Sequence, residues 1–457
     1  MSTIACVSPL RVAVVGSGPA GFYAADALLK SEDPRVEVDV LDRLPTPWGL
    51  VRLGVAPDHE NIKAVSRAFE KTAARPGFRF FGNVDVGGVV SHAELLARYD
   101  AVVYTVGAQT DRRLGVAGED LPGSWPASAF VAWYNGHPDF QDLSFDLSGE
   151  RAVVVGNGNV AIDCARMLAL TASELAPTDT VAAAERAIID SGIREIVMLG
   201  RRGPVQAAFT PPELQELGEL AGADVIVDPR DLELDPASAD ALEHDRERAR
   251  RNLDLLREFA SREPEGLPRR IVLRFLVSPV EIVGNGRVEG VELVRNELVS
   301  ERGRLVARAT DTRETIPCGL VLRSVGYRGV ELPGVPFDAE AGVMPNDDGR
   351  VRNAERTYCA GWIKRGPSGV IGTNKKDATE TVEALLDDAR AGRLVAPSSD
   401  DLAELLDERG AFFIEYDGWQ AIDAVERAAG EPLGRPRVKV TGWDELLQAG
   451  RSLQSSS

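Results

Sequence analysis

The chain has 457 residues, with 52 Lys and Arg against 71 Asp and Glu, which gives a formal net charge of −19 at pH 7. This acidic balance disfavours nucleic acid or an anionic membrane surface as the main partner, because long-range repulsion opposes both. With 44% hydrophobic and 27% charged residues, the composition is that of a folded, soluble protein, and the length predicts two or three domains.

Cysteine usage and the absence of long apolar segments bound the protein further. Cys6, Cys164, Cys318 and Cys359 lie too far apart for a CxxC pair, a zinc site or an iron–sulfur spacing, so we expect neither a redox-active dithiol nor a metal site. The first ten residues lack the basic segment of a signal peptide, and no apolar stretch reaches about 18 residues. These features predict a cytoplasmic protein.

The first hundred residues follow a strand, turn and helix pattern. Residues 11–15 predict a strand that ends at a glycine turn, and residues 20–30 have helical spacing. A second strand over residues 36–41 ends on an acidic residue. Residues 44–60 are rich in Pro and Gly and are too long for an ordinary connection, which indicates a functional loop. A further strand is predicted over residues 101–106.

The same opening pattern returns about 140 residues later. Residues 151–155 predict a strand, followed by a glycine turn and an apolar helix over residues 160–170. The next strand, residues 193–199, ends on two arginines. Two such starts predict an α/β fold with two Rossmann-like dinucleotide-binding domains.

The remaining elements are predicted from local patterns. A charged helix is expected over residues 242–259, and strands over residues 271–277, 288–294, 320–325 and 357–361, with an antiparallel pair around the turn at residues 284–287. A helix over residues 374–391 follows a glycine-rich loop. Beyond residue 393 we expect a linker and a small C-terminal appendage with two amphipathic stretches.

The first glycine turn has the spacing GxGxxG. It consists of Gly16, Ser17, Gly18, Pro19, Ala20 and Gly21. The first glycine allows the turn, the second lets the backbone approach a pyrophosphate, and the third lets the helix pack on the strand. The helix N-terminus then faces the phosphates, and Asp42 at the end of the next strand would accept hydrogen bonds from a ribose.

The second turn has the spacing GxGxxA and includes Asn157, Gly158, Asn159 and Val160. Its second strand ends on Arg201 and Arg202 instead of an acid. Two guanidinium groups supply charge-assisted donors to a 2′-phosphate, whereas an acid would repel it. The second site is therefore predicted to bind NADP, although paired arginines also occur in solvated turns.

Two dinucleotide sites in one chain suggest FAD in one and NADP in the other. The glycine-rich return at residues 366–373 places FAD at the first site, because a flavin needs backbone amides or a helix N-terminus near its pyrimidine edge. Trp362 is a candidate to cover a face of the ring, although a tryptophan in such a corner is more often part of the core.

Several longer motifs resemble the adrenodoxin-reductase type of ferredoxin–NADP⁺ reductase, including its bacterial members. The matching segments span most of residues 11–392 in order: VVGSGPAGFYAA (14–25), GLVRLGVAPDH (49–59), GNVDVG (82–87), GNGNVAIDCAR (156–166), GRRGPVQAAFTPPEL (200–214), LRFLVSP (273–279), CGLVLRSVGY (318–327) and GWIKRGPSGVIGT (361–373).

The resemblance implies an FAD-binding domain interrupted by an NADP-binding domain. The boundaries we predict are residues 8–108 and 322–395 for FAD, 109–321 for NADP, and 396–457 for the appendage. By resemblance, FAD contacts residues 16–21, Asp42, Leu50, Val86, Trp362, Gly369, Val370 and Ile371, and NADP contacts Asn157, Gly158, Asn159, Val160, Arg201, Arg202, Glu213 and Gly369. The ribose acid is often Glu in the family and is one methylene shorter here.

The same resemblance implies the activity. A hydride passes from NADPH to FAD, and single electrons pass on to a ferredoxin-type iron–sulfur protein, in either direction as potentials dictate. His59 and Glu213 lie in motifs that the family places near the flavin and the nicotinamide, so we expect them to tune charge or relay a proton, or else to be structural. An acidic ferredoxin needs a local basic patch, for which the sequence offers Arg246, Arg248, Arg250 and Arg251 or a solvated helix.

Other classes of protein are left open or disfavoured by single features. A disulfide reductase of this fold needs a CxxC near the flavin, and relatives of the glutamate synthase small chain carry cysteine clusters; neither is present. A reductase of flavodoxin or of a quinone would share every motif described above. A non-catalytic flavin-binding sensor is disfavoured because both the arginine pair and the flavin-edge glycines are present.

Overall fold

The structure, a computed structural model, describes residues 9–244, 247–301, 304–369, 371–394 and 400–451. The chain divides into two compact units. The first unit holds the described parts of Met1–Val55, His59–Thr110 and Gly326–Ser457, and the inserted unit consists of Ala56–Asp58 and Asp111–Val325. The first unit therefore includes the C-terminal segment that the sequence suggested as an appendage.

The first unit is built on a seven-stranded sheet with the order β16-β17-β18-β4-β1-β2-β3. The strands β3, β2, β1, β4 and β18 run parallel. Their bounds are β1 Leu10–Val15, β2 Val36–Asp42, β3 Phe78–Gly82, β4 Ala101–Tyr104, β16 Asn346–Asp347, β17 Arg350–Val351 and β18 Thr357–Cys359.

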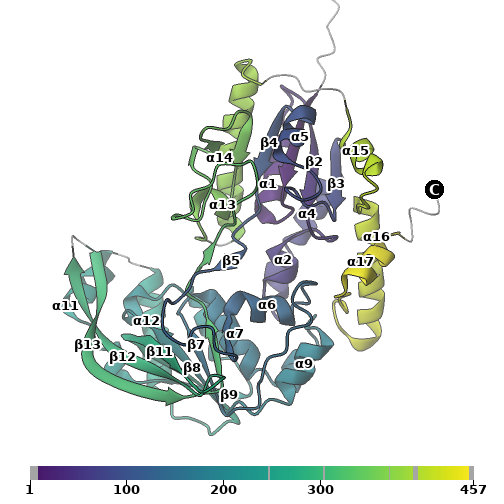
Figure 1. Ribbon diagram of the computed structural model, residues 1–457. Coiled ribbons are helices and arrows are strands. Elements are labelled where there is room, and N and C mark those ends of the chain that lie inside the picture. Colours follow the sequence, from purple (N-terminus) through teal and green to yellow (C-terminus); the bar gives the residue numbers. More distant parts are fainter. Residues whose placement is uncertain (1–8, 245–246, 302–303, 370, 395–399, 452–457) are drawn as a thin grey trace, which may run out of the picture. The chain divides into compact units, whose positions relative to one another are not determined.

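Helices cover this sheet, as Figure 1 shows. Successive residues of β1 enter opposite core clusters, because strand side chains alternate between faces: Val12 and Val14 pack with α1 and α14, and Ala13 and Val15 with α5. The helices are α1 Pro19–Leu29, α2 Leu50–Leu53, α3 Glu60–Lys63, α4 Ser66–Ala73, α5 His92–Arg98, α13 Trp362–Arg365, α14 Ile371–Arg390, α15 Leu402–Glu408, α16 Tyr416–Gly430 and α17 Trp443–Arg451, with the 3-10 turn η3 Glu431–Leu433.

The inserted unit is built on a six-stranded parallel sheet with the order β6-β14-β7-β8-β10-β9. These strands are β6 Ser124–Pro126, β7 Arg151–Val155, β8 Glu195–Gly200, β9 Ala223–Val227, β10 Arg269–Phe275 and β14 Leu320–Arg323. A separate antiparallel sheet follows, with β11 Val277–Val283, β12 Gly290–Glu301 and β13 Arg304–Pro317. Two short strands, β5 Thr110–Asp111 and β15 Tyr327–Arg328, form a two-stranded sheet.

Helices on the six-stranded sheet are short and numerous (Figure 1). They are α6 Ala127–Tyr134, α7 Asn159–Ala169, α8 Ala172–Leu175, α9 Ala182–Ile189, α10 Pro211–Leu217, α11 Pro236–His244 and α12 Arg248–Ser261, with the 3-10 turns η1 Pro204–Gln206 and η2 Pro229–Leu232. No described helix of either unit is both long and apolar enough to cross a membrane.

The structure confirms the predicted mixed α/β fold and differs from several predicted elements. Residues 242–244 end α11 and residues 248–259 make up most of α12, where we expected one helix. The strand predicted over residues 271–277 is β10, which runs parallel to β8 and β9; the antiparallel partner across the turn at 284–287 is β11. The described residues 400–451 contain three α-helices where we expected two amphipathic stretches.

Candidate functional site

The first glycine turn joins β1 to α1 and leaves open space at its centre. Gly16 has φ +104°, and a Cβ there would lie 2.7 Å from the carbonyl oxygen of Thr105. A Cβ on Gly21 would lie 2.0 Å from the Gly16 oxygen, whereas one on Gly18 would meet nothing within 4 Å. No side chain caps the N-terminus of α1. The turn therefore offers uncapped helix N–H groups beside a gap at Gly18, as a pyrophosphate requires.

Asp42 ends β2 beside this turn. Its Oδ2 accepts hydrogen bonds from the backbone N and the Oγ of Ser17, at 2.8 and 2.5 Å, and its Oδ1 accepts one from the backbone N of Leu44 at 2.9 Å. Burial raises the pKa of Asp42, although these hydrogen bonds act in the opposite direction. The carboxylate is thus fixed next to the turn, where the sequence predicts the ribose acid.

The predicted functional loop after Asp42 lies directly on the glycine turn. The backbone N of Trp48 donates to the carbonyl oxygen of Ser17 at 3.0 Å, and Trp48 has φ +83°. A Cβ on Gly49 would lie 2.9 Å from the Cα of Gly18, so only glycine allows this approach. Leu50 begins the short helix α2 and is 48% exposed. The predicted loop thus contains one helical turn.

The other predicted flavin contacts lie on two further loops of the first unit. Val86 is 7% exposed and follows β3, whose next residues hydrogen-bond to the backbone of Asp42 and Leu44. Trp362 begins α13, and its ring stacks on that of Tyr327 with centroids 5.6 Å apart. Gly369 has φ +81° and Ile371 begins α14. Val370 lies outside the described residues.

Two indole nitrogens near these loops are buried without a hydrogen-bond partner among the residues that the structure describes. They are Nε1 of Trp48 and Nε1 of Trp362. Buried donors are normally satisfied, so these two atoms fit a site completed by a bound group. Together with the gap at Gly18, they make the first unit suitable for the predicted FAD.

The second glycine turn repeats this arrangement in the inserted unit. Gly156 has φ +140°, and a Cβ there would lie 2.2 Å from the oxygen of Ser324. A Cβ on Gly158 would meet only the Cβ of Ala208, at 4.0 Å. No side chain caps α7, which begins at Asn159. The turn therefore leaves a gap and free helix N–H groups for a second pyrophosphate.

The start of α10 is tied to this second turn. The carbonyl oxygen of Asn157 accepts hydrogen bonds from the backbone N of Ala208 and of Phe209, at 3.0 and 3.1 Å. Asn159 accepts from the backbone N of Thr210 at 2.9 Å, and its Nδ2 lies 3.5 Å from Oε1 of Glu213. The structure thus brings together Glu213 and the predicted NADP turn.

Arg201 and Arg202 follow β8 directly, beside the same turn. A Cβ on Gly200 would lie 2.9 Å from Nδ2 of Asn157, so the arginine pair that follows Gly200 lies next to the second glycine turn. Burial and then the charge of Arg201 lower the pKa of Arg202. Among the described residues neither guanidinium has an ion pair or a side-chain hydrogen bond. Two unneutralised cations at this position are suited to a phosphate.

The two candidate proton-handling residues belong to different units. His59 lies in the first unit, is 7% exposed, and accepts hydrogen bonds on its carbonyl oxygen from the backbone N of Ile62 and Lys63. Glu213 lies in the first turn of α10 in the inserted unit and is partly buried. The roles predicted for them stay predictions.

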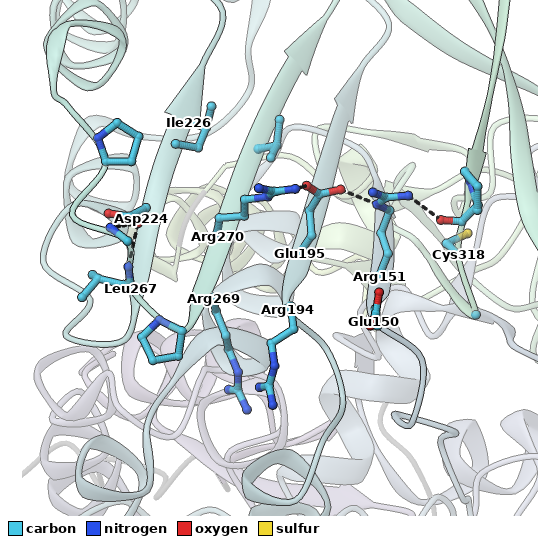
Figure 2. A pocket seen from close by; sticks show the side chains of 16 residues that line it. Glu150, Arg151, Arg194, Glu195, Asp224, Ile226, Leu267, Arg269, Arg270 and Cys318 are labelled. Atoms are coloured by element: carbon cyan, nitrogen blue, oxygen red, sulfur yellow. Dashed lines mark hydrogen bonds and ion pairs between the residues drawn. The ribbon is translucent and has the colours of Figure 1, made fainter.

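A cavity lies elsewhere in the inserted unit. It measures about 890 Å³ and is lined by the starts of β7, β8 and β10. Figure 2 shows Glu195 between Arg151 and Arg270, with which it forms ion pairs. Parallel sheets bind ligands at the carboxyl ends of their strands, so this cavity, at the amino ends, is not the nucleotide site.

The sequence did not predict three contacts at the first site. Tyr327 stacks on Trp362, Asp377 accepts a hydrogen bond from the backbone N of Gly361 at 2.5 Å, and Trp48 packs edge-on against Trp419. Each of these contacts joins two segments that are distant in the sequence or lie in different loops. The only local signal was the tryptophan next to Gly49.

Three of the four cysteines lie in the described part of the chain. Cys164, Cys318 and Cys359 are buried and free, and burial raises the pKa of Cys318 and of Cys359 to about 12. Cys6 lies outside the described residues. The three described thiols are therefore inert and belong to the cores.

These features define an oxidoreductase fold with two dinucleotide turns. The family model described as pyridine nucleotide-disulphide oxidoreductase matches residues 10–199. The chain is 52% identical to an NADPH-ferredoxin reductase FprA of Mycobacterium leprae over 96% of this chain and 98% of that one, and 40% identical to a mitochondrial NADPH:adrenodoxin oxidoreductase of Arabidopsis thaliana over 96% and 95%.

The chain is also similar to a solved structure. The Mycobacterium tuberculosis FprA structure in complex with NADPH is 52% identical, has a TM-score of 0.93, and is matched over 97% of this chain and 100% of that one. The chain belongs to the family that contains the FprA reductases and the adrenodoxin oxidoreductases.

Proposed function

We propose that this chain transfers electrons between NADPH and a ferredoxin-type iron–sulfur protein through FAD. The observation that carries the proposal is the pair of open glycine turns, of which only the second is followed by unneutralised arginines. The similarity to NADPH-ferredoxin reductases supports the same activity. When bound, FAD supplies the conversion between hydride transfer and single-electron transfer.

The protein's own residues bind and orient the two dinucleotides. We assign FAD to residues 16–21, Asp42, the loop from Trp48 to Leu50, Val86, and the loop that contains Trp362 and continues through residues 369–371. We assign NADP to residues 157–160, Arg201, Arg202 and Glu213, and Gly369 remains a proposed contact. In these terms residues 8–108 and 322–395 serve FAD, and residues 109–321 serve NADP.

The docking surface is a finer part of the proposal. Arg250 and Arg251 lie in the first turn of α12, are exposed, and have no ion pair among the described residues. Arg248 begins the same helix, whereas Arg246 lies outside the described residues. On a chain with net charge −19, such a local positive group suits an acidic iron–sulfur protein.

A pair of assays tests this function. The purified protein should reduce ferricyanide with NADPH, and should reduce cytochrome c only when a ferredoxin is added. Activity in the first assay with no ferredoxin dependence in the second would instead favour a flavodoxin or quinone as acceptor. A protein that binds FAD and NADPH but reduces neither acceptor would be a flavin-binding sensor.

A further inference from the structure

The described C-terminal residues 400–451 pack on the rest of the first unit. We call them the C-terminal segment. Ile414 forms an antiparallel bridge with Gly82 at the end of β3, with reciprocal backbone hydrogen bonds of 2.8 Å. Asp401 pairs with Arg79 of the same strand at 2.8 Å. The segment therefore covers the edge strand of the sheet, and its helix α16 lies beyond that edge (Figure 1).

A buried ion pair joins α16 to the loop that follows Asp42. Glu426 of α16 accepts hydrogen bonds from Arg52 of α2 at 2.8 and 2.5 Å, and the side chains are 0% and 4% exposed. Arg437 and the backbone N of Val440 also donate to Glu426, at 3.2 and 2.9 Å. Although burial opposes ionisation, these cations and donors lower the pKa of Glu426. Both oxygens of the Glu426 carboxylate therefore accept hydrogen bonds.

Aromatic packing extends this junction to the glycine turn. The ring of Trp419, also on α16, meets that of Trp48 edge-on with centroids 4.9 Å apart, and the guanidinium of Arg52 lies 5.1 Å from the Trp419 ring centre. On its other side, Trp48 donates its backbone N–H to the carbonyl oxygen of Ser17, and a Cβ on Gly49 would lie 2.9 Å from the Cα of Gly18. An unbroken chain of contacts therefore runs from α16 to the turn.

We propose that Glu426 is a positioning residue for FAD, which holds Arg52 and Trp48 so that their loop stays against the glycine turn. The inference rests on the proposed function, because it takes that turn as the FAD site. Removing the charge of Glu426 leaves the buried Arg52 without its counter-charge. Arg52 must then move toward water, and the loop that covers the turn moves with it.

The test compares two matched variants of the full chain. Glu426→Gln keeps the shape of the side chain and removes its charge. Asp401→Asn is the matched control. It also keeps the shape of the side chain and removes its charge, but it breaks the ion pair of the C-terminal segment with Arg79 of β3. FAD affinity is measured by titrating apoprotein and following flavin fluorescence, with NADP⁺ affinity and thermal midpoint recorded for each variant.

We expect Glu426→Gln to raise the dissociation constant of FAD about tenfold, equal to about 1.4 kcal/mol, and Asp401→Asn to change it less than about twofold. NADP⁺ affinity should be unchanged in both. If both variants lose thermal stability and keep the wild-type FAD affinity, Glu426 is a stability residue and the inference is wrong.

A second variant covers the case in which Glu426→Gln does not fold. Trp419→Leu keeps the ion pair and removes the aromatic contact with Trp48, so it should also weaken FAD binding; an unchanged affinity would overturn the inference. A wild-type chain that takes up no FAD would refute the proposed function itself. Wild-type uptake with normal affinity in the variants would refute the inference alone.

Discussion

Ser17 donates two hydrogen bonds to one oxygen of Asp42, from its backbone N at 2.8 Å and from its Oγ at 2.5 Å. The residue that would hold the ribose is thereby also part of the turn that would hold the pyrophosphate. A substitution at Asp42 should therefore affect binding and folding in different ways.

We predict that Asp42→Asn weakens FAD binding more than it changes the stability of the apoprotein. The folded protein raises the pKa of Asp42, so the ionised form costs stability at pH 7, and that cost disappears as pH falls through the raised pKa. A neutral amide removes this cost but gives up a hydrogen bond accepted from Ser17 or Leu44, so the two effects on stability oppose each other. A lost hydrogen bond to a charged group is worth about 1.5 to 3 kcal/mol, so FAD affinity should fall at least about tenfold.

Urea unfolding of the apoprotein at pH 7 and FAD titration measure the two effects. Glu37→Gln, on an exposed position of the same strand, is the control for a charge removed from β2. An FAD affinity of Asp42→Asn equal to that of Glu37→Gln would contradict the assignment of Asp42 to the FAD site.

The arginine pair should determine coenzyme choice. Arg201→Ala with Arg202→Ala removes charged donors worth about 1.5 to 3 kcal/mol each, so the preference for NADPH over NADH should fall by about tenfold or more. Steady-state kcat/KM with both coenzymes measures it. Arg230→Ala, an exposed arginine already paired with Asp228 at 2.6 Å, should leave the preference unchanged. A double variant with wild-type preference would exclude this pair as the 2′-phosphate site.

Proton handling gives a third prediction. His59→Gln or Glu213→Gln should shift the pH dependence of hydride transfer from NADPH while FAD stays bound, because flavin reduction moves protons as well as electrons. Stopped-flow reduction from pH 6 to 9 follows the rate, and flavin absorbance follows FAD content. Profiles identical to that of the wild type in both variants would assign the two side chains to the scaffold.

Ferredoxin docking should depend on α12. Arg250→Glu with Arg251→Glu should abolish ferredoxin-dependent cytochrome c reduction and leave ferricyanide reduction intact. Salt should weaken the wild-type reaction, because the Debye length falls from about 10 Å at 0.1 M to about 3 Å at 1 M. The control is Arg230→Glu, which reverses an exposed charge elsewhere in the inserted unit. Equal effects of the double variant on both acceptors, or on neither, would move the docking surface elsewhere.

A buried histidine should make folding sensitive to mild acid. His92 is 8% exposed, and its Nδ1 lies 2.8 Å from the hydroxyl of Tyr104. Burial, and then the charge of Arg356, lower its pKa below 6.5, so the folded state favours the neutral ring. The stability that this provides is present above pH 6.5 and is lost as pH falls below it. Urea unfolding at pH 7, 6 and 5 should show a shallower decline for His92→Gln, and parallel curves would contradict this.

The parts of the site that the sequence predicted are those with local signals. Each glycine turn lies between a strand and a helix that are adjacent in sequence. Asp42 ends the next strand after the first turn, and Arg201 directly follows the next strand after the second, so spacing alone located them. Local patterns did not separate β10 from β11, because apolar residues continue across the boundary at Leu276, which has φ +56°. The contacts of Glu426 with Arg52 join residues 374 positions apart, and no single-sequence pattern records such a pairing.

The register of β18 against β4 bears on how the chain assembles during synthesis. Val102 pairs with Thr357, so the sheet of the first unit lacks a strand until the ribosome has made more than three quarters of the chain. The inserted unit, apart from residues 56–58, is continuous from Asp111 to Val325 and is complete before that strand emerges. Because domains generally fold as units as they are made, we expect the nascent inserted unit to fold while β4 still lacks β18 at its side, and the C-terminal segment to cover β3 only at the end.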